Sequence, residues 1–308
     1  MELNGVSKVQ VLMSTYNGSK YIADQIKSII CNGFSNIHLN IRDDGSSDKA
    51  TLESLNNFIN CNNITVNFEE NVGVIRSFYN LLQRSNDSYD YYAFSDQDDI
   101  WKNGKIARAV ETLKKMDKNK PILYCTNIEI VDANLKHLSF SKVKSPRPSF
   151  ENALVENIVT GCTMVINRRA KDLLLGHFPR HTLMHDWWAY LVISCFGKVI
   201  YDSHPTILYR QHDSNVVGYT SNIFADFVKR VRSFLKRGSE RKLQKQAEEF
   251  YNFYNNSIDE KKLKVLKLFI KDRKNLLNRI KYAYKSPIYR NNLLDNIILK
   301  ILIILNRV

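Results

Sequence analysis

The sequence predicts an α/β fold, in which a mostly parallel sheet with flanking helices is followed by a basic helical extension. Apolar, β-branched segments alternate with helix-like segments as far as Ser95, and this is the pattern of parallel strands joined by crossover helices. Charge is also distributed unevenly, because residues 221–308 carry 21 Lys and Arg against 8 Asp and Glu, whereas residues 1–220 carry 24 against 23. We therefore predict an α/β domain over 1–220 and a basic amphipathic helical region over 221–308.

Four short apolar segments, each followed by turn residues, are predicted to be strands. They are 9–15, 37–41, 64–68 and 91–95. Helix patterns lie between them, at 21–31, at 49–59 and in a segment that ends near Leu82, and either Ser47 or Asp48 can cap the second helix. No G-x-G-x-x-G follows the first strand, so we do not expect a dinucleotide-binding unit.

Polar side chains lie at the carboxyl ends of the first, second and fourth predicted strands. They are Thr15, Asp43, Asp44, Asp96 and Asp98. Open parallel sheets bind ligands beyond the carboxyl ends of their strands. We therefore expect these residues to line one shared site.

The segment Asp96-Gln97-Asp98 has the D-x-D form that can hold a divalent metal together with a substrate diphosphate. Carboxylate oxygens suit Mg²⁺ or Mn²⁺. A solvated acidic loop is the alternative, and by itself it is the commoner explanation of such a motif. An EF-hand fits less well, because its turn glycine and closing glutamate are missing.

The rest of the α/β domain is predicted in the same way. The expected elements are a helix at 102–116, strands at 122–127, 128–132 and 159–167, a basic loop at 136–150, a helix from Met184 to about Cys195, and edge strands at 199–202 and 206–210. From Phe224 onward the pattern is helical, basic and amphipathic.

Six motifs, taken in order, resemble glycosyltransferase family 2, which has a GT-A nucleotide-sugar fold. They are V-L-M-S-T-Y-N-G, R-D-D-G-S-S-D, N-V-G-V-I-R-S-F-Y-N-L-L, F-S-D-Q-D-D-I-W, M-H-D-W-W and L-Y-R-Q-H-D-S-N-V-V-G. The last two are similar to bacterial rhamnosyltransferases of cell-surface polysaccharide synthesis. The resemblance covers about residues 8–220.

The resemblance implies a donor site built from the strand ends. Thr15 with Asp43 or Asp44 would line the pocket for a pyrimidine base, whose ring N–H a carboxylate can accept. Asp96 would hold the ribose hydroxyls, and Asp98 would bind Mg²⁺ or Mn²⁺. For Asp43 and Asp44, a capped turn is the alternative.

Three basic residues are implied to complete this site. Arg76 would reach the nucleotide or its diphosphate, and Arg210 and His212 would close over the diphosphate, with His212 as a candidate further metal ligand. The alternatives are an arginine on a helix surface for Arg76 and a hydrogen-bonded surface residue for His212. Asp99 is an ambiguous third carboxylate beside the D-x-D motif.

The M-H-D-W-W motif is implied to serve the acceptor. Asp186 would be the general base that takes a proton from the acceptor hydroxyl, and Trp187 and Trp188 would form a sugar-stacking wall. The alternatives are that Asp186 is an acidic residue favoured by the helix dipole and that both tryptophans belong to the core.

The implied activity is an inverting, metal-dependent transfer of L-rhamnose from dTDP-L-rhamnose to a lipid-linked saccharide. A family 2 enzyme for a UDP-linked glucose, galactose or N-acetylglucosamine is one alternative, and a non-catalytic saccharide- or nucleotide-binding module is another. A nucleic-acid partner is not expected, because aromatic stacking platforms are not interleaved with the lysines of the tail.

Composition indicates the redox state of the cysteines and the expected location of the protein. The five cysteines are scattered and form no C-x-x-C, which favours reduced thiols. We expect no signal peptide and no transmembrane helix. The basic tail and the Leu/Ile-rich segment 293–305 predict attachment to an anionic membrane surface or a subunit contact in a homo-oligomer. The expected location is cytoplasmic, peripheral at the inner face of the bacterial cell membrane.

Overall fold

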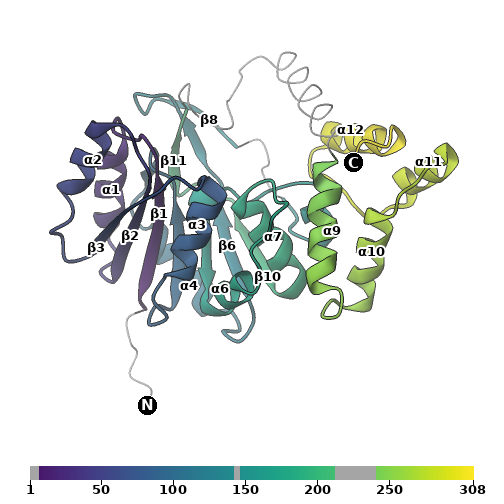
Figure 1. Cartoon of the computed structure of the whole chain (residues 1–308), viewed down its shortest axis with the longest axis horizontal. Coiled ribbons are helices and arrows are strands. Elements are labelled where there is room, and N and C mark those ends of the chain that lie inside the picture. The colour runs from purple at the N-terminus through teal and green to yellow at the C-terminus, as the bar shows by residue number, and fades with distance from the viewer. Residues whose placement is uncertain (1–6, 142–145, 212–240) are drawn as a thin grey trace. The chain divides into compact units, whose positions relative to one another are not determined.

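The computed structural model describes residues 7–141, 146–211 and 241–308 (Figure 1). These residues form two compact units. The first contains 7–141, 159–178 and 197–211, and the second contains 146–158, 179–196 and 241–308. The predicted boundary at residue 220 lies outside the described residues and stays a prediction.

A seven-stranded sheet forms the centre of the first unit, in the order β10-β6-β9-β4-β1-β2-β3. Its strands are β1 (Val9–Thr15), β2 (Ile37–Asp44), β3 (Ile64–Glu69), β4 (Tyr91–Ser95), β6 (Ile122–Thr126), β9 (Val165–Asn167) and β10 (Lys198–Asp202). Neighbouring strands run parallel, except where β9 pairs with β4 and β6. The predicted mostly parallel α/β sheet is confirmed.

A smaller sheet of four strands has the order β5-β11-β7-β8. Its strands are β5 (Ile100–Trp101), β7 (Glu129–Val131), β8 (His137–Phe140) and β11 (Ile207–Arg210). Two predictions were wrong here. β11 is an interior strand, because β5 and β7, which are distant in sequence, pair with its two sides. β8 lies in a segment that was predicted to be a loop.

The strand predicted at 159–167 was also wrong over most of its length. A 3-10 turn, η1 (Gly161–Thr163), precedes the short strand β9. The backbone N–H and the hydroxyl of Thr163 both donate to the carbonyl oxygen of Thr160, at 2.8 and 2.7 Å. These two bonds close a tight turn, so the extended backbone begins only at Val165.

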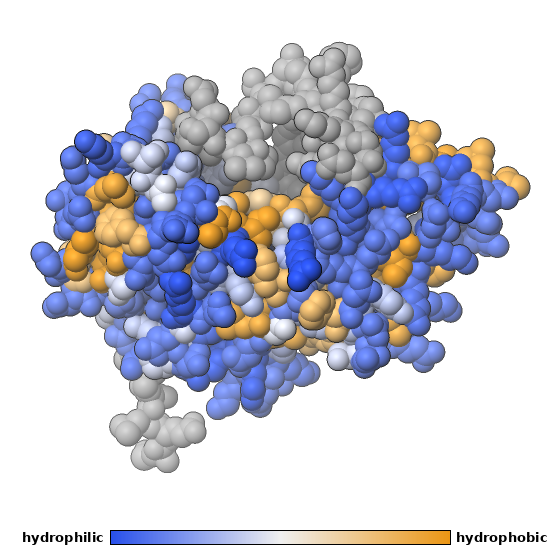
Figure 2. Space-filling view, viewed as in Figure 1, coloured by the Kyte–Doolittle hydropathy of each residue, from blue (hydrophilic) through white to orange (hydrophobic). Residues whose placement is uncertain are grey.

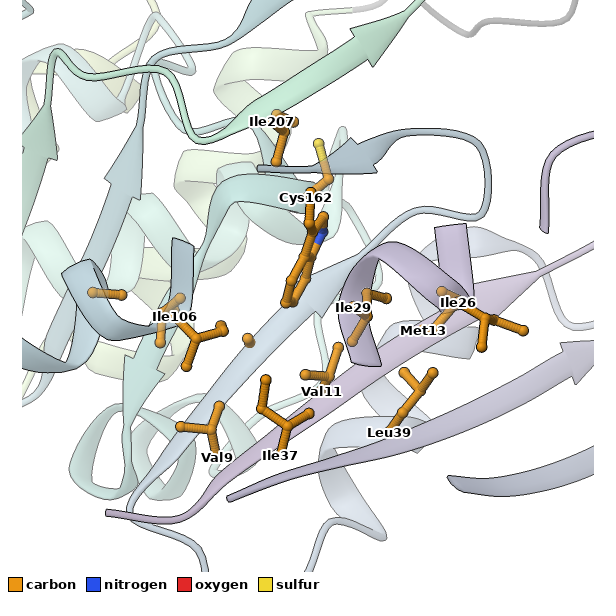
Figure 3. Close-up of a cluster of buried hydrophobic side chains, with 14 of the residues drawn as sticks. Val9, Val11, Met13, Ile26, Ile29, Ile37, Leu39, Ile106, Cys162 and Ile207 are labelled. Atoms are coloured by element: carbon orange, nitrogen blue, oxygen red, sulfur yellow. The ribbon is translucent and has the colours of Figure 1, made fainter. Parts of the chain in front are cut away.

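Helices cover both faces of the large sheet. They are α1 (Ile22–Ile30), α2 (Lys49–Asn56), α3 (Val74–Gln83), α4 (Lys105–Lys114) and α6 (Arg168–Leu175). Aliphatic side chains of β1, β2, α1 and α4 meet in one buried cluster, which includes Val11, Leu39, Ile26 and Ile106 (Figure 3). Each such side chain stabilises the fold by about 1.5–3 kcal/mol when fully buried, so this cluster fixes the strands whose ends carry the predicted site.

The second unit is helical and is organised around α7 (His185–Phe196), with α5 (Phe150–Ala153) and α9 (Lys242–Tyr254) beside it. Nine of the twelve residues of α7 are buried. Phe250 of α9 packs against the rings of Phe150, Trp188 and Phe196, with centroids 5.5, 6.0 and 6.2 Å away. α9 is therefore part of the core of this unit.

Three further helices complete the chain: α10 (Glu260–Ile270), α11 (Leu276–Lys285) and α12 (Leu293–Ile304). Hydrophobic side chains lie at the surface over α11 and α12 (Figure 2). They include Leu277, Leu293, Leu294, Ile297 and Ile301. Across the part of the chain that the structure describes, none of the helices is both long and apolar enough to cross a membrane.

Candidate functional site

The carboxyl ends of β1, β2 and β4 meet at one edge of the sheet, because the three strands are adjacent and parallel. Thr15 is in register with Asp43 on β2. Gln97, which follows β4, ties this edge together. Its Oε1 accepts hydrogen bonds from the Thr15 hydroxyl at 2.7 Å and from the Tyr16 N–H at 2.9 Å. The predicted juxtaposition of strand ends is therefore present, and the middle residue of the D-x-D motif fixes it.

Gly18, in the turn after β1, lies directly against the Gln97 side chain. A Cβ atom on Gly18 would lie 2.2 Å from Gln97 Oε1. Any other residue at position 18 would displace the Gln97 side chain and loosen its bonds to Thr15 and Tyr16. The role of Gln97 depends on contacts between distant segments, and the sequence alone gave no signal for it.

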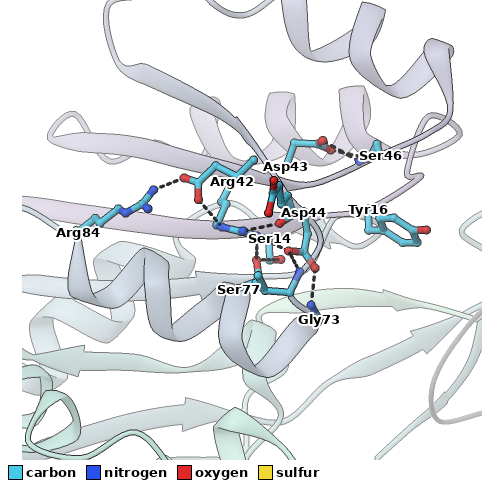
Figure 4. A network of polar contacts seen from close by, with 12 residues as sticks. Ser14, Tyr16, Arg42, Asp43, Asp44, Ser46, Gly73, Ser77 and Arg84 are labelled. Carbon is cyan, nitrogen blue, oxygen red and sulfur yellow. Dashed lines mark hydrogen bonds and ion pairs between the residues drawn. The ribbon is translucent and has the colours of Figure 1, made fainter.

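Asp43 is buried and holds the turn that follows β2 (Figure 4). Its carboxylate accepts hydrogen bonds from the N–H of Ser46 at 2.9 Å and from its hydroxyl at 2.5 Å. Gly45 has φ +74°, and a Cβ atom there would lie 2.7 Å from the backbone nitrogen of Asn71. The structure therefore contains the capped turn. Recognition of a base by Asp43 stays a prediction.

Asp44 is buried as well and binds the start of α3. Its two carboxylate oxygens accept hydrogen bonds from the N–H groups of Val72 and Gly73, each at 2.9 Å. Negative charge is favourable at a helix N-terminus. In this structure, Asp44 anchors α3 to the end of β2, and a contact between Asp44 and a nucleotide also stays a prediction.

Arg42 is the cation of this network, and its role was not predicted from the sequence. Its guanidinium pairs with Asp44, lies 3.1 Å from a Glu69 oxygen and donates to Ser77 Oγ at 3.0 Å (Figure 4). Ser77 Oγ is in turn 2.6 Å from Ser14 Oγ. One buried arginine therefore links the ends of β1, β2 and β3 to α3.

The carboxylates after β4 are placed differently from one another. Asp96 and Asp98 are half-buried, whereas Asp99 is buried and accepts a hydrogen bond from the Arg210 N–H at 3.2 Å. Burial, together with the negative charges of Asp98 and Asp96, raises the pKa of Asp99 well above its ordinary value. A cation beside these groups would offset their repulsion.

Ligand atoms of Asp96, Asp99 and Cys162 lie within 4.8 Å of one another. The Oδ2 atom of Asp99 is buried and has no hydrogen-bond partner among the described residues. Carboxylates fit Mg²⁺ or Mn²⁺, but a thiol is a poor ligand for these ions, and burial raises the pKa of Cys162. The acidic segment therefore fits a hard divalent cation through its carboxylates. Asp98 does not belong to this group of three, and its metal role stays a prediction.

Lys105 is a buried cation close enough to Asp99 for the two charges to interact. Its Nζ lies 4.3 Å from the centroid of the Trp101 ring and has no hydrogen-bond partner among the residues the structure describes. Burial lowers the pKa of Lys105 to about 8, and the charge of Asp99 acts in the opposite direction. Nothing in the sequence distinguishes Lys105, because a lysine near the start of a helix is ordinarily exposed to solvent.

The two predicted donor-site arginines differ. Arg210 is buried, and its guanidinium donates to the carbonyl oxygens of Asp98 at 3.0 Å and Ala133 at 2.7 Å, so it holds the backbone of the acidic segment. Arg76 is exposed on α3, with its guanidinium 5.4 Å from the centroid of Phe178. Contacts of either arginine with a diphosphate stay predictions. His212 lies outside the described residues.

The three predicted acceptor residues belong to the second unit. Asp186 is buried in the first turn of α7, and its carboxylate accepts a hydrogen bond from the N–H of Trp187 at 2.7 Å. Trp187 Nε1 donates to the carbonyl oxygen of Ala153 at 2.7 Å, and Trp188 packs on Phe250. Both indoles are buried, so they present little surface to a sugar. Their burial favours the core alternative, and acceptor binding by them stays a prediction.

The chain is similar in sequence to known proteins. Residues 10–174 match the model of the family described as Glycosyl transferase family 2. The dTDP-rhamnosyl transferase RfbG of Shigella flexneri is 32% identical over 218 residues, covering 67% of this chain and 73% of RfbG. The Escherichia coli UDP-Glc:alpha-D-GlcNAc-diphosphoundecaprenol beta-1,3-glucosyltransferase WfgD is 28% identical over 161 residues, covering 52% of this chain and 60% of WfgD.

Solved structures resemble the chain in fold. The crystal structure of S. aureus TarS 1-349 in complex with UDP-GlcNAc has a TM-score of 0.53 at 17% identity, covering 91% of this chain and 82% of that chain. The mannosyltransferase PcManGT from Pyrobaculum calidifontis, in complex with GDP-Man and Mn2+, has a TM-score of 0.51 at 15% identity, covering 92% and 77%. At these identities the likeness shows the shared GT-A fold.

Proposed function

Because this chain belongs to glycosyltransferase family 2, we propose that it transfers L-rhamnose from dTDP-L-rhamnose to a lipid-linked saccharide acceptor. The observation that carries this proposal is the meeting of Thr15, Asp43 and the acidic segment 96–99 at the carboxyl edge of a parallel sheet. The choice of rhamnose is supported by the 32% identity to the Shigella flexneri dTDP-rhamnosyl transferase RfbG.

Residues of the first unit would bind the donor. Thr15 and Asp43 would face the pyrimidine base, Asp96 the ribose, and Arg76 and Arg210 the diphosphate. His212, which lies outside the described residues, would close over the diphosphate as well. Asp98 would hold Mg²⁺ or Mn²⁺, which when bound offsets the charge that grows on the departing diphosphate. The exposure of Arg76 supports its part, because its charge is open to a ligand.

Asp186 would be the general base of the acceptor side. It would take the proton of the acceptor hydroxyl as the oxygen bonds to the anomeric carbon and the bond from that carbon to the diphosphate oxygen breaks. Attack from the side opposite the leaving group inverts the configuration at this carbon. A single carboxylate suffices, because no covalent sugar intermediate forms.

The test is a donor panel with the purified protein. dTDP-L-rhamnose, UDP-glucose, UDP-galactose and UDP-N-acetylglucosamine are each offered with Mg²⁺, Mn²⁺ or EDTA, and release of nucleoside diphosphate is followed with and without α-D-GlcNAc-diphosphoundecaprenol as acceptor probe. We expect the fastest metal-dependent release from dTDP-L-rhamnose. Faster release from a UDP-sugar would overturn the rhamnose assignment, and binding without any turnover would indicate a non-catalytic module.

A UDP-glucose donor is the second candidate, supported by the 28% identity to the glucosyltransferase WfgD. The panel separates the two, because WfgD-like specificity would appear as UDP-glucose turnover with the GlcNAc-diphospholipid probe. The shorter matched segment, 52% of this chain against 67% for RfbG, makes rhamnose the first choice.

The acceptor implies a membrane partner. We propose that the enzyme attaches to an anionic surface on the cytoplasmic side, where a lipid-linked saccharide would present its sugars. The exposed apolar residues Leu294, Ile297 and Ile301 of α12 support this, as does the excess of Lys and Arg in the tail. Burial of the same apolar face against a second copy of the chain is the alternative.

A further inference from the structure

The segment that leads into α7 is held by two polar side chains of α9. The backbone N–H groups of Arg180 and His181 donate to the two carboxylate oxygens of Glu249, at 2.6 and 2.5 Å. About one helical turn before Glu249, Gln246 Oε1 accepts hydrogen bonds from the N–H of Leu183 at 3.1 Å and from the Thr182 hydroxyl at 2.9 Å. Four donors of consecutive residues therefore end on one face of α9.

These acceptors are placed in the interior of the second unit. Gln246 is 1% exposed and Glu249 is 8% exposed. Burying a carboxylate is costly unless hydrogen bonds or charges compensate it, and bonds to a charged acceptor are stronger than those between neutral groups. The adjacent Glu248 faces solvent and bonds to Gln244 of its own helix. Gln246 and Glu249 thus bind the backbone of another segment, whereas Glu248 does not.

The hydrogen bonds from α9 extend to the first turn of α7. The single proton of the Thr182 hydroxyl is shared between Gln246 Oε1 and the carbonyl oxygen of Met184, which lies 3.0 Å from the hydroxyl oxygen. The same carbonyl accepts the N–H of Trp188 at 3.1 Å. The bonds from α9 therefore continue directly into the hydrogen bonds that start the helix. Asp186 lies within this turn.

We propose that Glu249 and Gln246 are positioning residues that hold residues 180–184 and thereby fix Asp186 for proton transfer. This inference rests on the proposed function, in which Asp186 is the base. A misplacement of about 1 Å at a reacting group can lower the rate about a hundredfold. The basic C-terminal region thus contributes to the catalytic step through α9, in addition to any role at a membrane.

The first test measures the clamp without any reaction. Hydrogen exchange of a peptide covering residues 179–185 is compared between the full-length protein, Glu249→Gln and the control Glu248→Gln. In Glu249→Gln the amide NH₂ opposes a backbone N–H, so the amides of Arg180 and His181 should exchange at least about tenfold faster. Glu248→Gln should match the wild type. Unchanged exchange in Glu249→Gln would overturn the clamp.

The second test asks whether the clamp acts through Asp186. Release of dTDP from dTDP-L-rhamnose, or of the nucleotide from the preferred donor of the panel, is measured with the GlcNAc-diphospholipid probe. We expect Glu249→Gln to lower kcat by about 10–100-fold with an unchanged KM for the donor, and to have less than about a twofold effect in the Asp186→Asn background. An equal loss in both backgrounds would show a merely structural role and overturn the proposal.

A second variant covers the case in which Glu249→Gln does not fold. Gln246→Met keeps the volume of the side chain and removes its acceptor, so the same two readouts apply to the amide of Leu183 and to kcat. Full activity of Asp186→Asn would instead refute the base assigned under the proposed function. The exchange result would then still report on the clamp, so the two failures are distinguishable.

Discussion

Two arginines that share one glutamate offer a direct measurement of what the buried network at the strand ends contributes. Both Arg42 and Arg84 pair with Glu69. The Arg42 side chain is 3% exposed and the Arg84 side chain 60% exposed. We compare Arg42→Met with Arg84→Met, because methionine keeps much of the apolar stem and removes the charge from each position in the same way.

The expected magnitudes differ because the partners differ in burial. Arg42→Met leaves the Asp44 carboxylate, which is only 4% exposed, without its cation, and removing one partner of a buried pair costs about 3–5 kcal/mol. The hydrogen bonds from Val72 and Gly73 still reach Asp44, so we expect the lower end, about 3 kcal/mol. Arg84→Met removes an exposed ion pair, and such pairs contribute about 0–1 kcal/mol.

The assay is urea unfolding of both variants, with hydrogen exchange of peptides from β2 as a probe specific to the first unit. The double variant Arg42→Met/Asp44→Asn loses the charge of Asp44 together with its cation. Measured beside the single variant Asp44→Asn, the two losses should therefore be less than additive, with a coupling of about 0.5–3 kcal/mol. Equal effects of Arg42→Met and Arg84→Met, or additive losses in the double variant, would refute the argument from buried charge.

Three further predictions concern the metal, a buried lysine and the membrane. Asp98→Ala should lower metal-stimulated donor turnover by about a thousandfold or more, and near-normal turnover at saturating Mn²⁺ would remove Asp98 from the metal site. Burial lowers the pKa of Lys105 from 10.5 to about 8, so between these pH values the unfolded state binds more protons than the folded state. The free energy of unfolding of the wild type, relative to that of Lys105→Met, should therefore rise with pH by up to about 3 kcal/mol. A difference in urea titrations that does not depend on pH would contradict this. Ile297→Glu/Ile301→Glu should weaken co-sedimentation with anionic vesicles, most of all at high salt, where the attraction of the lysines is screened; unchanged pelleting would argue that α12 does not meet the lipid.

Local patterns predicted the large sheet because each of its first four strands is a short apolar run bounded by turn residues, and parallel pairing follows from the helices between them. The same reasoning placed Thr15, Asp43 and Asp96 at one edge. It failed for residues 159–164 and for β11, since a turn closed by Thr163 and pairing partners distant in sequence decide those segments.

The polar interior of the site was beyond local reasoning for a similar reason. Arg42, Gln97 and Lys105 look like surface residues in the sequence, and only tertiary contacts bury them or direct them at distant segments. On α9, Glu248 and Glu249 are adjacent glutamates, yet one faces solvent and the other accepts two backbone N–H groups. The sequence shows the helical periodicity of α9, but it does not show which segment each face of the helix contacts.

Because the inward face of α9 belongs to the core of the second unit, attachment to a membrane cannot be tested by deleting the C-terminal region. Deleting everything beyond residue 220 would remove Phe250 from the rings of Trp188 and Phe196 and release residues 180–183 from Gln246 and Glu249. Loss of vesicle binding by such a truncation would then report collapse of the second unit as readily as loss of a lipid contact. Substitutions at Ile297 and Ile301 avoid this, because both side chains are about half exposed while Leu299, Leu302 and Ile303 keep α12 packed on its other side. Their effect on vesicle binding, together with unchanged hydrogen exchange of residues 179–185, separates attachment from positioning.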